Sequence, residues 1–568
     1  MSGNSDARSK PAPQGSRTAR AWYLAAVCLL PAIVLWRQDN ILFPSYGSID
    51  SWTYFGYFRN LVEFKRGLLF GNTFGTHWSL ILPGAALHGL FGPLAAEWLL
   101  HLGAHTLASV SLFLTLLWVV GARRAFAAAM LFSLNPWVNL ATAADFVDGM
   151  GIAYCLLAMA LLTWAALAPV RRLALVGAGM ALAALVYCDP EWMMLAPLLP
   201  LYYLGLARAW HGDSPARSLA ALCRWFGAGC AIVTAAFAAI NYRLDGHAFF
   251  YASPILAVLH RAAPRAAWWQ GLWRDGAPSI WLAFPMAAAL ASVAVLIRER
   301  RRAHQAMTGA ALFSWLFLGA LAWMTGCQMR GIPMLASAYP ASILLPFGFL
   351  AMGAGFWEYL ETARPRHYIL FCCALALALG YAWSGEGPVV TSGLAYPVWT
   401  GVAALAASLL WRRTPESALC GLAGFFVLTD LGVAPCYGGL EAHGYRDQYV
   451  ALCRARQRIE TVRQGGPVRF WFDKQDRAAS DAVALTSTYS WESRLSDSFY
   501  PAPCGETVAP GTLIAMIATD RWPSADAAAM ALTGCWIGKR LGVEAVETDT
   551  IPRGASSYRL SLLRVESQ

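Results

Sequence analysis

Apolar runs long enough to cross a bilayer recur along most of this chain. Runs of about 18 residues or more, each sufficient for a helix across roughly 30 Å of hydrocarbon, repeat over residues 21–435. Of the 568 residues, 58% are hydrophobic and only 13% are charged, which excludes a single soluble core. We therefore expect an all-α polytopic membrane protein with about thirteen transmembrane helices, followed by a small C-terminal α/β domain.

Positive charge alternates with the apolar runs in the way that sets membrane orientation. With the N-terminus in the cytosol, every predicted inner loop is basic. These loops contain Arg123-Arg124, Arg171-Arg172, the arginines of 208–224 and 298–302, Arg364 with Arg366, and Arg412-Arg413. The pattern predicts that the C-terminal domain lies on the side of the membrane opposite to the cytosol. It also accounts for the net charge of +10 without a nucleic-acid partner.

Three regions follow from this layout. Residues 1–20 are polar and rich in Ser and Pro, typical of a disordered cytosolic tail. Residues 21–435 form the transmembrane part, whose first extracytoplasmic loop is 38–97. Within that loop, the apolar segment 80–91 is too short to span and is expected to lie along the interface, so that 98–120 is the second span.

Residues 436–568 have the alternating polarity of a small α/β domain. The pattern predicts helices at 448–463 and 525–532 and strands at 468–472, 513–518 and 558–565. Of the thirteen cysteines, the outer part contains Cys436, Cys453, Cys504 and Cys535. One or two disulfides among them would fit an oxidising compartment, with the pairing left open.

The first candidate for chemistry is Asp50, in the polar and aromatic segment 46–78. If a helix starts just after Ser48, Asp50 and Tyr54 lie one turn apart on one face. Aspartate is also a good helix N-cap, so a general base and a structural cap both remain open.

Four more acids are predicted at the same membrane face. Asp145 and Asp148 lie between the third and fourth spans, and a helix dipole accounts for one of them more easily than for two. Asp189 and Glu191 flank Pro190 in the next outer turn, where they are either solvated turn residues or ligands for Mg²⁺ or Mn²⁺.

Outer loops are normally poor in positive charge, so bases found there are candidates for binding a phosphate rather than only lipid headgroups. The candidate bases are Arg59, Lys65, Arg66, His77, Arg243 and Arg330. Arg330 is isolated on a short loop that leads into Tyr339 and Pro340.

Three motifs together carry a family resemblance over roughly residues 21–350. IDSWTYFGYFRN with THWSLILPGAALHGLFG follows the first span, DFVDGMGIAY follows the third, and Arg330 precedes the Tyr-Pro pair. This order resembles the glycosyltransferase C superfamily, in particular the bacterial branch similar to protein O-mannosyltransferases and the lipid A aminoarabinose transferase.

The resemblance implies a polyprenyl-phosphate-linked sugar donor and an envelope glycan, lipid or protein acceptor, with Asp50 as general base and Asp148 as a second catalytic acid. Substrates would contact Tyr54, Arg59, Lys65, Arg66, His77, Asp145, Arg243, Arg330 and Tyr339. A transporter or flippase of a lipid-linked saccharide remains an alternative, although no paired halves are evident. A non-catalytic protein of envelope polysaccharide assembly is another.

Overall fold

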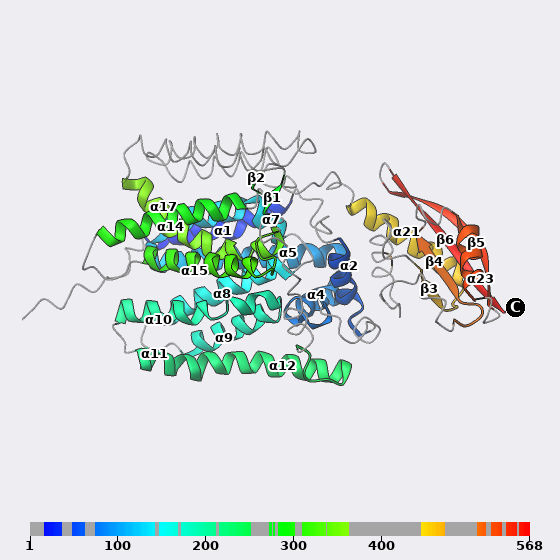
Figure 1. Ribbon diagram of the computed structural model, residues 1–568, viewed down its shortest axis with the longest axis horizontal. Helices are drawn as coiled ribbons and strands as arrows, with labels where there is room; N and C mark the ends of the chain where they lie inside the picture. The colour runs from blue at the N-terminus through cyan, green and yellow to red at the C-terminus, as the bar shows by residue number, and fades with distance from the viewer. Residues whose placement is uncertain are drawn as a thin grey trace, which may run out of the picture.

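A computed structural model describes residues 16–36, 48–62, 74–142, 147–167, 172–211, 215–251, 272–274, 277–278, 282–301, 309–336, 338–362, 445–471, 485, 508–517, 524–536, 541–553 and 556–567. Up to residue 362 the structure is helical, apart from a short hairpin formed by β1 (Trp273–Arg274) and β2 (Ala277–Pro278). The helices pack into an elongated bundle, and a small sheet lies beyond one end of it (Figure 1).

The bundle is built mainly from helices that run back and forth along its length. In order these are α1 (Arg17–Trp36), α5 (Pro93–Val120), α6 (Ala122–Leu134), α8 (Val147–Ala166), α9 (Arg172–Val186), α10 (Leu198–His211), α11 (Pro215–Ala221), η4 (Leu222–Phe226), α12 (Gly227–Asp245), α14 (Ala283–Arg301), α15 (Gly309–Met329) and α17 (Leu344–Thr362). One hydrophobic cluster, with Leu112, Phe132, Leu156, Phe317 and Leu350 among its members, forms the core.

Four helices in the described residues are long and apolar enough to cross a membrane: Pro93–Val120, Val147–Ala166, Ala216–Asp245 and Gly309–Met329. These agree with the predicted polytopic architecture. The total of about thirteen spans stays a prediction, because residues 363–435 lie outside the described parts.

Short elements cover one end of the bundle. They are α2 (Ser48–Arg59), η2 (Phe74–Thr76), α4 (Trp78–Leu90), α7 (Pro136–Thr142), η3 (Pro190–Met194) and α16 (Ala338–Ala341). At 13 residues α4 is too short for a span, as predicted for 80–91, and α5 contains the predicted second span. Asn135 starts α7, because its Oδ1 accepts the backbone N–H of Trp137 at 3.0 Å and that of Val138 at 3.1 Å.

The C-terminal part is a three-layer α/β unit. Its sheet has the order β3 (Val468–Phe470), β4 (Leu513–Ile517), β6 (Ser556–Ser567), β5 (Leu541–Arg553), and only the β3–β4 pair is parallel. Alternate residues of β4 contribute to two separate hydrophobic clusters. One includes Leu452 of α21 (Tyr445–Arg463) and the other includes Leu532 of α23 (Ala525–Trp536), so a helix covers each face of the sheet.

The predicted helices and strands of this unit are confirmed, but sequence analysis missed β5. Val543, Glu544 and Ala545 alternate as in a strand, but the register with β6 shifts between Ala545 and Glu547. After the shift, Glu547 and Asp549 stand where the pattern calls for hydrophobic residues. Cys453 is a free thiol, whereas Cys436, Cys504 and the Cys535 side chain lie outside the described parts.

Candidate functional site

Helix α2 begins at Ser48, so Asp50 lies in its first turn as predicted. The Asp50 side chain is outside the described parts. The following turns of α2 are buried: Tyr54 is 1% exposed, and Tyr57 and Phe58 are equally enclosed. Aromatic residues on α2 therefore anchor the helix against the bundle rather than facing solvent.

Tyr54 is joined to His77, which immediately precedes α4. The Tyr54 hydroxyl is hydrogen-bonded to Nδ1 of His77, and the edge of the Phe74 ring packs against Tyr54 with centroids 5.4 Å apart. Burial lowers the pKa of His77 to about 3, so the imidazole is neutral near pH 7. Its Nε2 is buried and makes no hydrogen bond to any atom of the described residues.

A second group of polar residues surrounds the first turn of α8. Asp148 is 5% exposed there, and the negative charges of Asp189 and Glu191 act on its carboxylate. The Asp189 Oδ1 accepts the Glu191 backbone N–H at 2.9 Å and thereby caps η3, so the predicted turn at Pro190 is confirmed. The Cys188 thiol donates to the Val147 carbonyl at 3.3 Å, which ties this turn to α8.

Two glycines allow neighbouring elements to approach Asp148 closely. A Cβ atom on Gly149 would lie 2.5 Å from the Ala141 carbonyl oxygen, and one on Gly151 would lie 2.7 Å from Nε1 of Trp192. Side chains at these positions would push α7 and η3 away from α8. The two small residues therefore help to place the acids.

Contacts between α4, α8, α9 and α12 join these groups into one rim. The Tyr154 hydroxyl donates to the Ser79 carbonyl at 2.9 Å, and the Tyr251 hydroxyl donates to the Val186 carbonyl. Tyr54, Tyr57, Val147, Cys188 and Tyr251 belong to one hydrophobic cluster. Burial and the Asp189 carboxylate raise the pKa of Tyr251, which places that tyrosine beside the acids.

The loop after α15 reaches the same rim. The Cys327 thiol lies 3.8 Å from the Met194 sulfur of η3, and the Gln328 side chain accepts the Leu335 backbone N–H at 3.0 Å. Ser342, just after α16, lies beside Asp148. Arg330 itself is exposed at the start of this loop, and its role in binding a phosphate stays a prediction.

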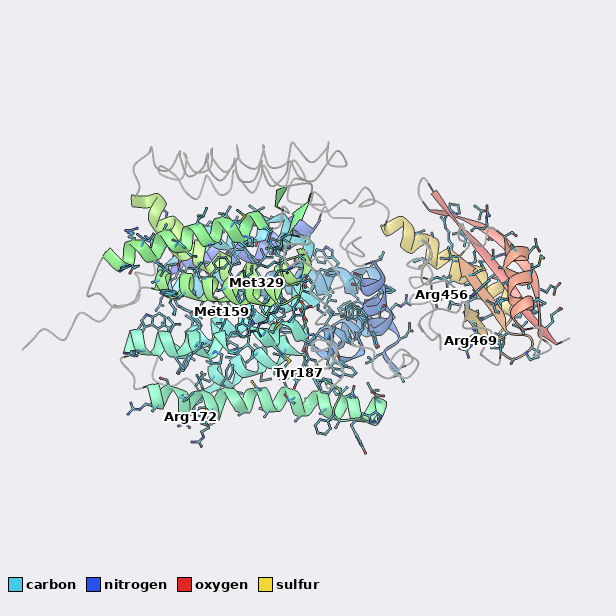
Figure 2. The ribbon with its side chains drawn as sticks, in the orientation of Figure 1. Met159, Arg172, Tyr187, Met329, Arg456 and Arg469 are labelled. Atoms are coloured by element: carbon cyan, nitrogen blue, oxygen red, sulfur yellow. The ribbon has the colours of Figure 1, made fainter. Side chains whose placement is uncertain are left out.

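Figure 2 shows how one helix connects the two ends of the bundle. Tyr187 lies at the end of α9 near α2 and α4, whereas Arg172 lies toward the opposite end. Arg172 belongs to a predicted inner loop, and Tyr187 leads directly to Asp189. The separation along α9 agrees with the predicted assignment of acids and basic clusters to opposite membrane faces.

Arg59 and Arg243 are the other predicted site residues whose side chains the structure describes. Arg59 is half-buried, with its guanidinium 5.8 Å from the centre of the Phe55 ring, and Arg243 is exposed in the last turn of α12. Four further positions are not described, either as whole residues or as side chains: Lys65, Arg66, Asp145 and Tyr339.

Several rim residues were not singled out from the sequence. Tyr154, Cys188 and Ser342 have no distinctive spacing, and their proximity to the acids depends on helix packing. The described residues contain no group of three His, Cys, Asp or Glu side chains placed to hold a metal ion. The binding of Mg²⁺ or Mn²⁺ at Asp189 and Glu191 thus stays a prediction.

No protein-family model matches the chain, and no curated protein matches it. Solved structures do. Apo ArnT from Cupriavidus metallidurans superposes with a TM-score of 0.52 at 14% identity, covering 96% of this chain and 98% of ArnT. Its complex with undecaprenyl phosphate gives a TM-score of 0.51 at the same identity and coverage.

A third structure, the arabinofuranosyltransferase AftD from Mycobacteria, gives a TM-score of 0.48 at 14% identity and covers 98% of this chain and 40% of AftD. The chain shares the ArnT fold over nearly its whole length, so the fold predicted from the sequence is confirmed. It is a multi-pass membrane protein.

Proposed function

We propose that the chain is a membrane glycosyltransferase that moves a sugar from a polyprenyl-phosphate carrier to an acceptor hydroxyl. The observation that carries the proposal is the convergence of the acid-bearing turns at one rim. Side-chain contacts bring together helix α2, the start of α8, the turn before η3 and the loop after α15. The ArnT fold, captured in one structure with undecaprenyl phosphate, supports the same chemistry.

The donor phosphate would be held by neutral and cationic hydrogen-bond donors. With the Tyr54 hydroxyl donating to Nδ1, the proton of the neutral His77 ring lies on Nε2, which can donate to a phosphate oxygen. Exposed Arg330 supplies positive charge on the loop that reaches the rim, and we assign exposed Arg243 to the same binding set. Arg59, Lys65, Arg66 and Tyr339 complete the proposed binding set.

The transfer itself is a single displacement. Asp50 accepts the proton of the acceptor hydroxyl as that oxygen attacks the anomeric carbon. The new C–O bond forms while the bond between that carbon and the phosphate oxygen breaks, polyprenyl phosphate leaves, and the configuration inverts. Asp148, with Asp145, orients the acceptor. Holding both substrates at the rim supplies much of the rate.

The membrane setting follows from the charge pattern. We place the chain in a bacterial cytoplasmic membrane, with the N-terminus in the cytosol and the rim and residues 436–568 on the periplasmic side. The acceptor is then an envelope glycan, lipid or protein, which the C-terminal α/β unit would help to recognise.

A test compares Asp50→Asn with the wild-type full-length protein in lipid nanodiscs. Release of undecaprenyl phosphate is measured from a panel of undecaprenyl-phosphate-linked sugars, with membranes of a deletion strain as the acceptor source. Because α2 begins at Ser48, Asp50 is its third residue and not its N-cap. A purely structural role would therefore be a favourable charge near the helix N-terminus, worth about 0.3 to 1 kcal/mol, and predicts nearly full activity in Asp50→Asn. A general-base role predicts a loss of about 10²-fold or more, with binding of undecaprenyl phosphate itself unchanged.

Asp526→Asn is the matched control, because Asp526 is an exposed aspartate in the first turn of α23. It should transfer sugar at the wild-type rate. Full activity in Asp50→Asn would contradict Asp50 as the base. If the deletion strain retains every envelope glycan and the wild-type protein turns over no donor, the glycosyltransferase proposal is wrong.

A further inference from the structure

A buried cluster of one carboxylate and two imidazoles lies where α4 meets α5. Glu97 is fully buried in the second turn of α5. Its Oε1 lies 2.6 Å from Nε2 of His88, and its Oε2 lies 3.4 Å from Nε2 of His101. Removing a carboxylate from water is costly unless it is paired, so such a cluster near a membrane face calls for a role that offsets this cost.

On one side the cluster fixes the end of α7. His101 Nδ1 donates to the Thr142 carbonyl at 3.0 Å, a helix-terminal acceptor that has no donor within its own helix. His105 Nδ1 lies 2.7 Å from the Thr142 hydroxyl, which donates to the Val138 carbonyl at 2.8 Å and therefore accepts from His105. Two imidazoles of α5 thus hold the last residue of α7.

On the other side the cluster touches α2. The His88 ring packs edge-on against Phe55, with centroids 5.4 Å apart, and tilted against Phe58 at 5.7 Å. A continuous path of side chains therefore runs from α2 through His88, Glu97 and His101 to Thr142.

The two ends of this path are the segments that carry the candidate catalytic acids. Asp50 lies on α2, and the chain after Thr142 leads through Asp145 to Asp148 at the start of α8. Glu97, His101 and His105 recur every four residues on one face of an apolar helix, a pattern visible in the sequence but not linked there to the acids.

We propose that His88, Glu97 and His101 are positioning residues of the transfer reaction, which set where the segment after α7 lies relative to α2. This inference rests on the proposed function. The three residues act through Thr142 and α2, so their loss lowers kcat and leaves KM for the lipid donor unchanged. A misplacement of about 1 Å in a catalytic group costs on the order of 10²-fold in rate.

Two substitutions of one residue separate the contacts. In His101→Asn, the amide nitrogen takes the place of Nδ1 and keeps the bond to Thr142. In His101→Gln, it takes the place of Nε2, keeps the contact with Glu97 and loses Thr142. Rates are measured with the donor that turns over fastest in the panel above. We expect kcat to fall about 10- to 100-fold in His101→Gln and by a smaller factor in His101→Asn, which keeps Thr142 but loses Glu97.

Ser109→Ala is the control, since Ser109 lies farther along the same face of α5 and bonds to the Ser133 hydroxyl at 2.8 Å, away from Thr142. It should leave kcat unchanged. Equal kcat in His101→Gln and wild type would overturn the proposal, as would an equal rise in KM and fall in kcat.

Hydrogen–deuterium exchange of the full-length protein gives a readout that needs no donor. His101→Gln and Glu97→Gln should speed amide exchange in residues 136–142. His101→Asn, which keeps Thr142 but loses Glu97, should speed it less than His101→Gln, and Ser109→Ala should leave it unchanged. Unchanged exchange in both Gln variants would overturn the positioning role. Faster exchange along the whole chain would also overturn it, because it would show that the cluster stabilises the fold in general and does not position α7. If the wild-type protein turns over no donor, only the proposed function is contradicted. The exchange measurement still shows whether the cluster holds α7 in place.

Discussion

The ionisable side chains of the rim owe their protonation states to residues distant in sequence. His77 is kept neutral by burial and is bonded to Tyr54, which lies 23 residues earlier. Burial raises the pKa of Tyr57, and the Asp245 carboxylate from the end of α12 adds to the shift. The residue type sets which protonation states a side chain can adopt, and its neighbours in the fold decide which of these states is populated.

The depressed pKa of His77 predicts an acid-sensitive fold. Its pKa is about 3 in the folded protein against 6.5 for the ordinary side chain. Below 6.5 the unfolded chain binds a proton that the folded chain does not, so stability is full above 6.5 and falls by up to about 1.4 kcal/mol per pH unit toward 3. Thermal unfolding of the purified protein between about pH 7 and about pH 4 measures this slope.

His77→Asn supplies the comparison for that measurement, because Asn has no titrating group in this range. The variant is expected to lose part of the acid-dependent destabilisation while starting from a lower melting temperature at neutral pH. The same dependence on pH in both proteins would show that His77 is not buried as a neutral ring.

At the scale of elements, the rim is assembled from short helices held by close packing rather than by length. α7 has 7 residues and η3 has 5, too few to be stable alone in water. Their placement depends on α8, whose Gly149 and Gly151 leave room for Ala141 and Trp192. The position of Asp148 relative to α7 and η3 therefore depends on Gly149 and Gly151 as well as on the charges around it.

Gly149→Ala should displace α7 and impair transfer. The added Cβ would meet the Ala141 carbonyl oxygen at 2.5 Å, and a backbone atom cannot turn aside as a side chain can. We expect a loss of about 1 to 3 kcal/mol in unfolding free energy and a lower kcat, measured by melting and by donor turnover.

Gly103→Ala on α5 is the matched substitution, since nothing lies within 4 Å of its added Cβ. It should be neutral, or stabilising by up to about 1 kcal/mol through helix propensity. An equal effect of the two alanines would remove close packing as the explanation.

For the whole molecule, the antiparallel course of the helices brings alternate connections to the same end. α9 ends and α10 begins near Asp189, α12 ends at Asp245, and α15 ends just before Arg330. The opposite connections carry Arg172 and the start of α11. Membrane sidedness of the candidate site is consequently a property of the bundle as a whole and not of any one loop.

Labelling with a membrane-impermeant maleimide tests that sidedness. In a background with all thirteen native cysteines replaced, Phe249→Cys should react in intact spheroplasts, because Phe249 is 92% exposed beyond α12. Arg172→Cys should react only after the membrane is permeabilised. The reverse pattern would place the candidate site in the cytosol and contradict the proposed function.

Much of this arrangement could be predicted from local patterns. The apolar spans, the short helix α4, the α2 start at Ser48 and the turn at Pro190 each depend on residues close together in the chain. β5 was missed because its acids hide the alternation of a strand. The network around Glu97 was missed because its partners, from His88 to Thr142, come from three separate helices.

The sequence by itself determined that the chain spans a membrane, where its charged loops fall, and which turns carry acids and bases, since hydrophobic periodicity and charge bias act over a few residues. Only the tertiary structure decided which of those turns meet. The neutral His77, the acids around Asp148 and the path from Phe55 to Thr142 arise from helix packing, which joins residues that no local pattern connects.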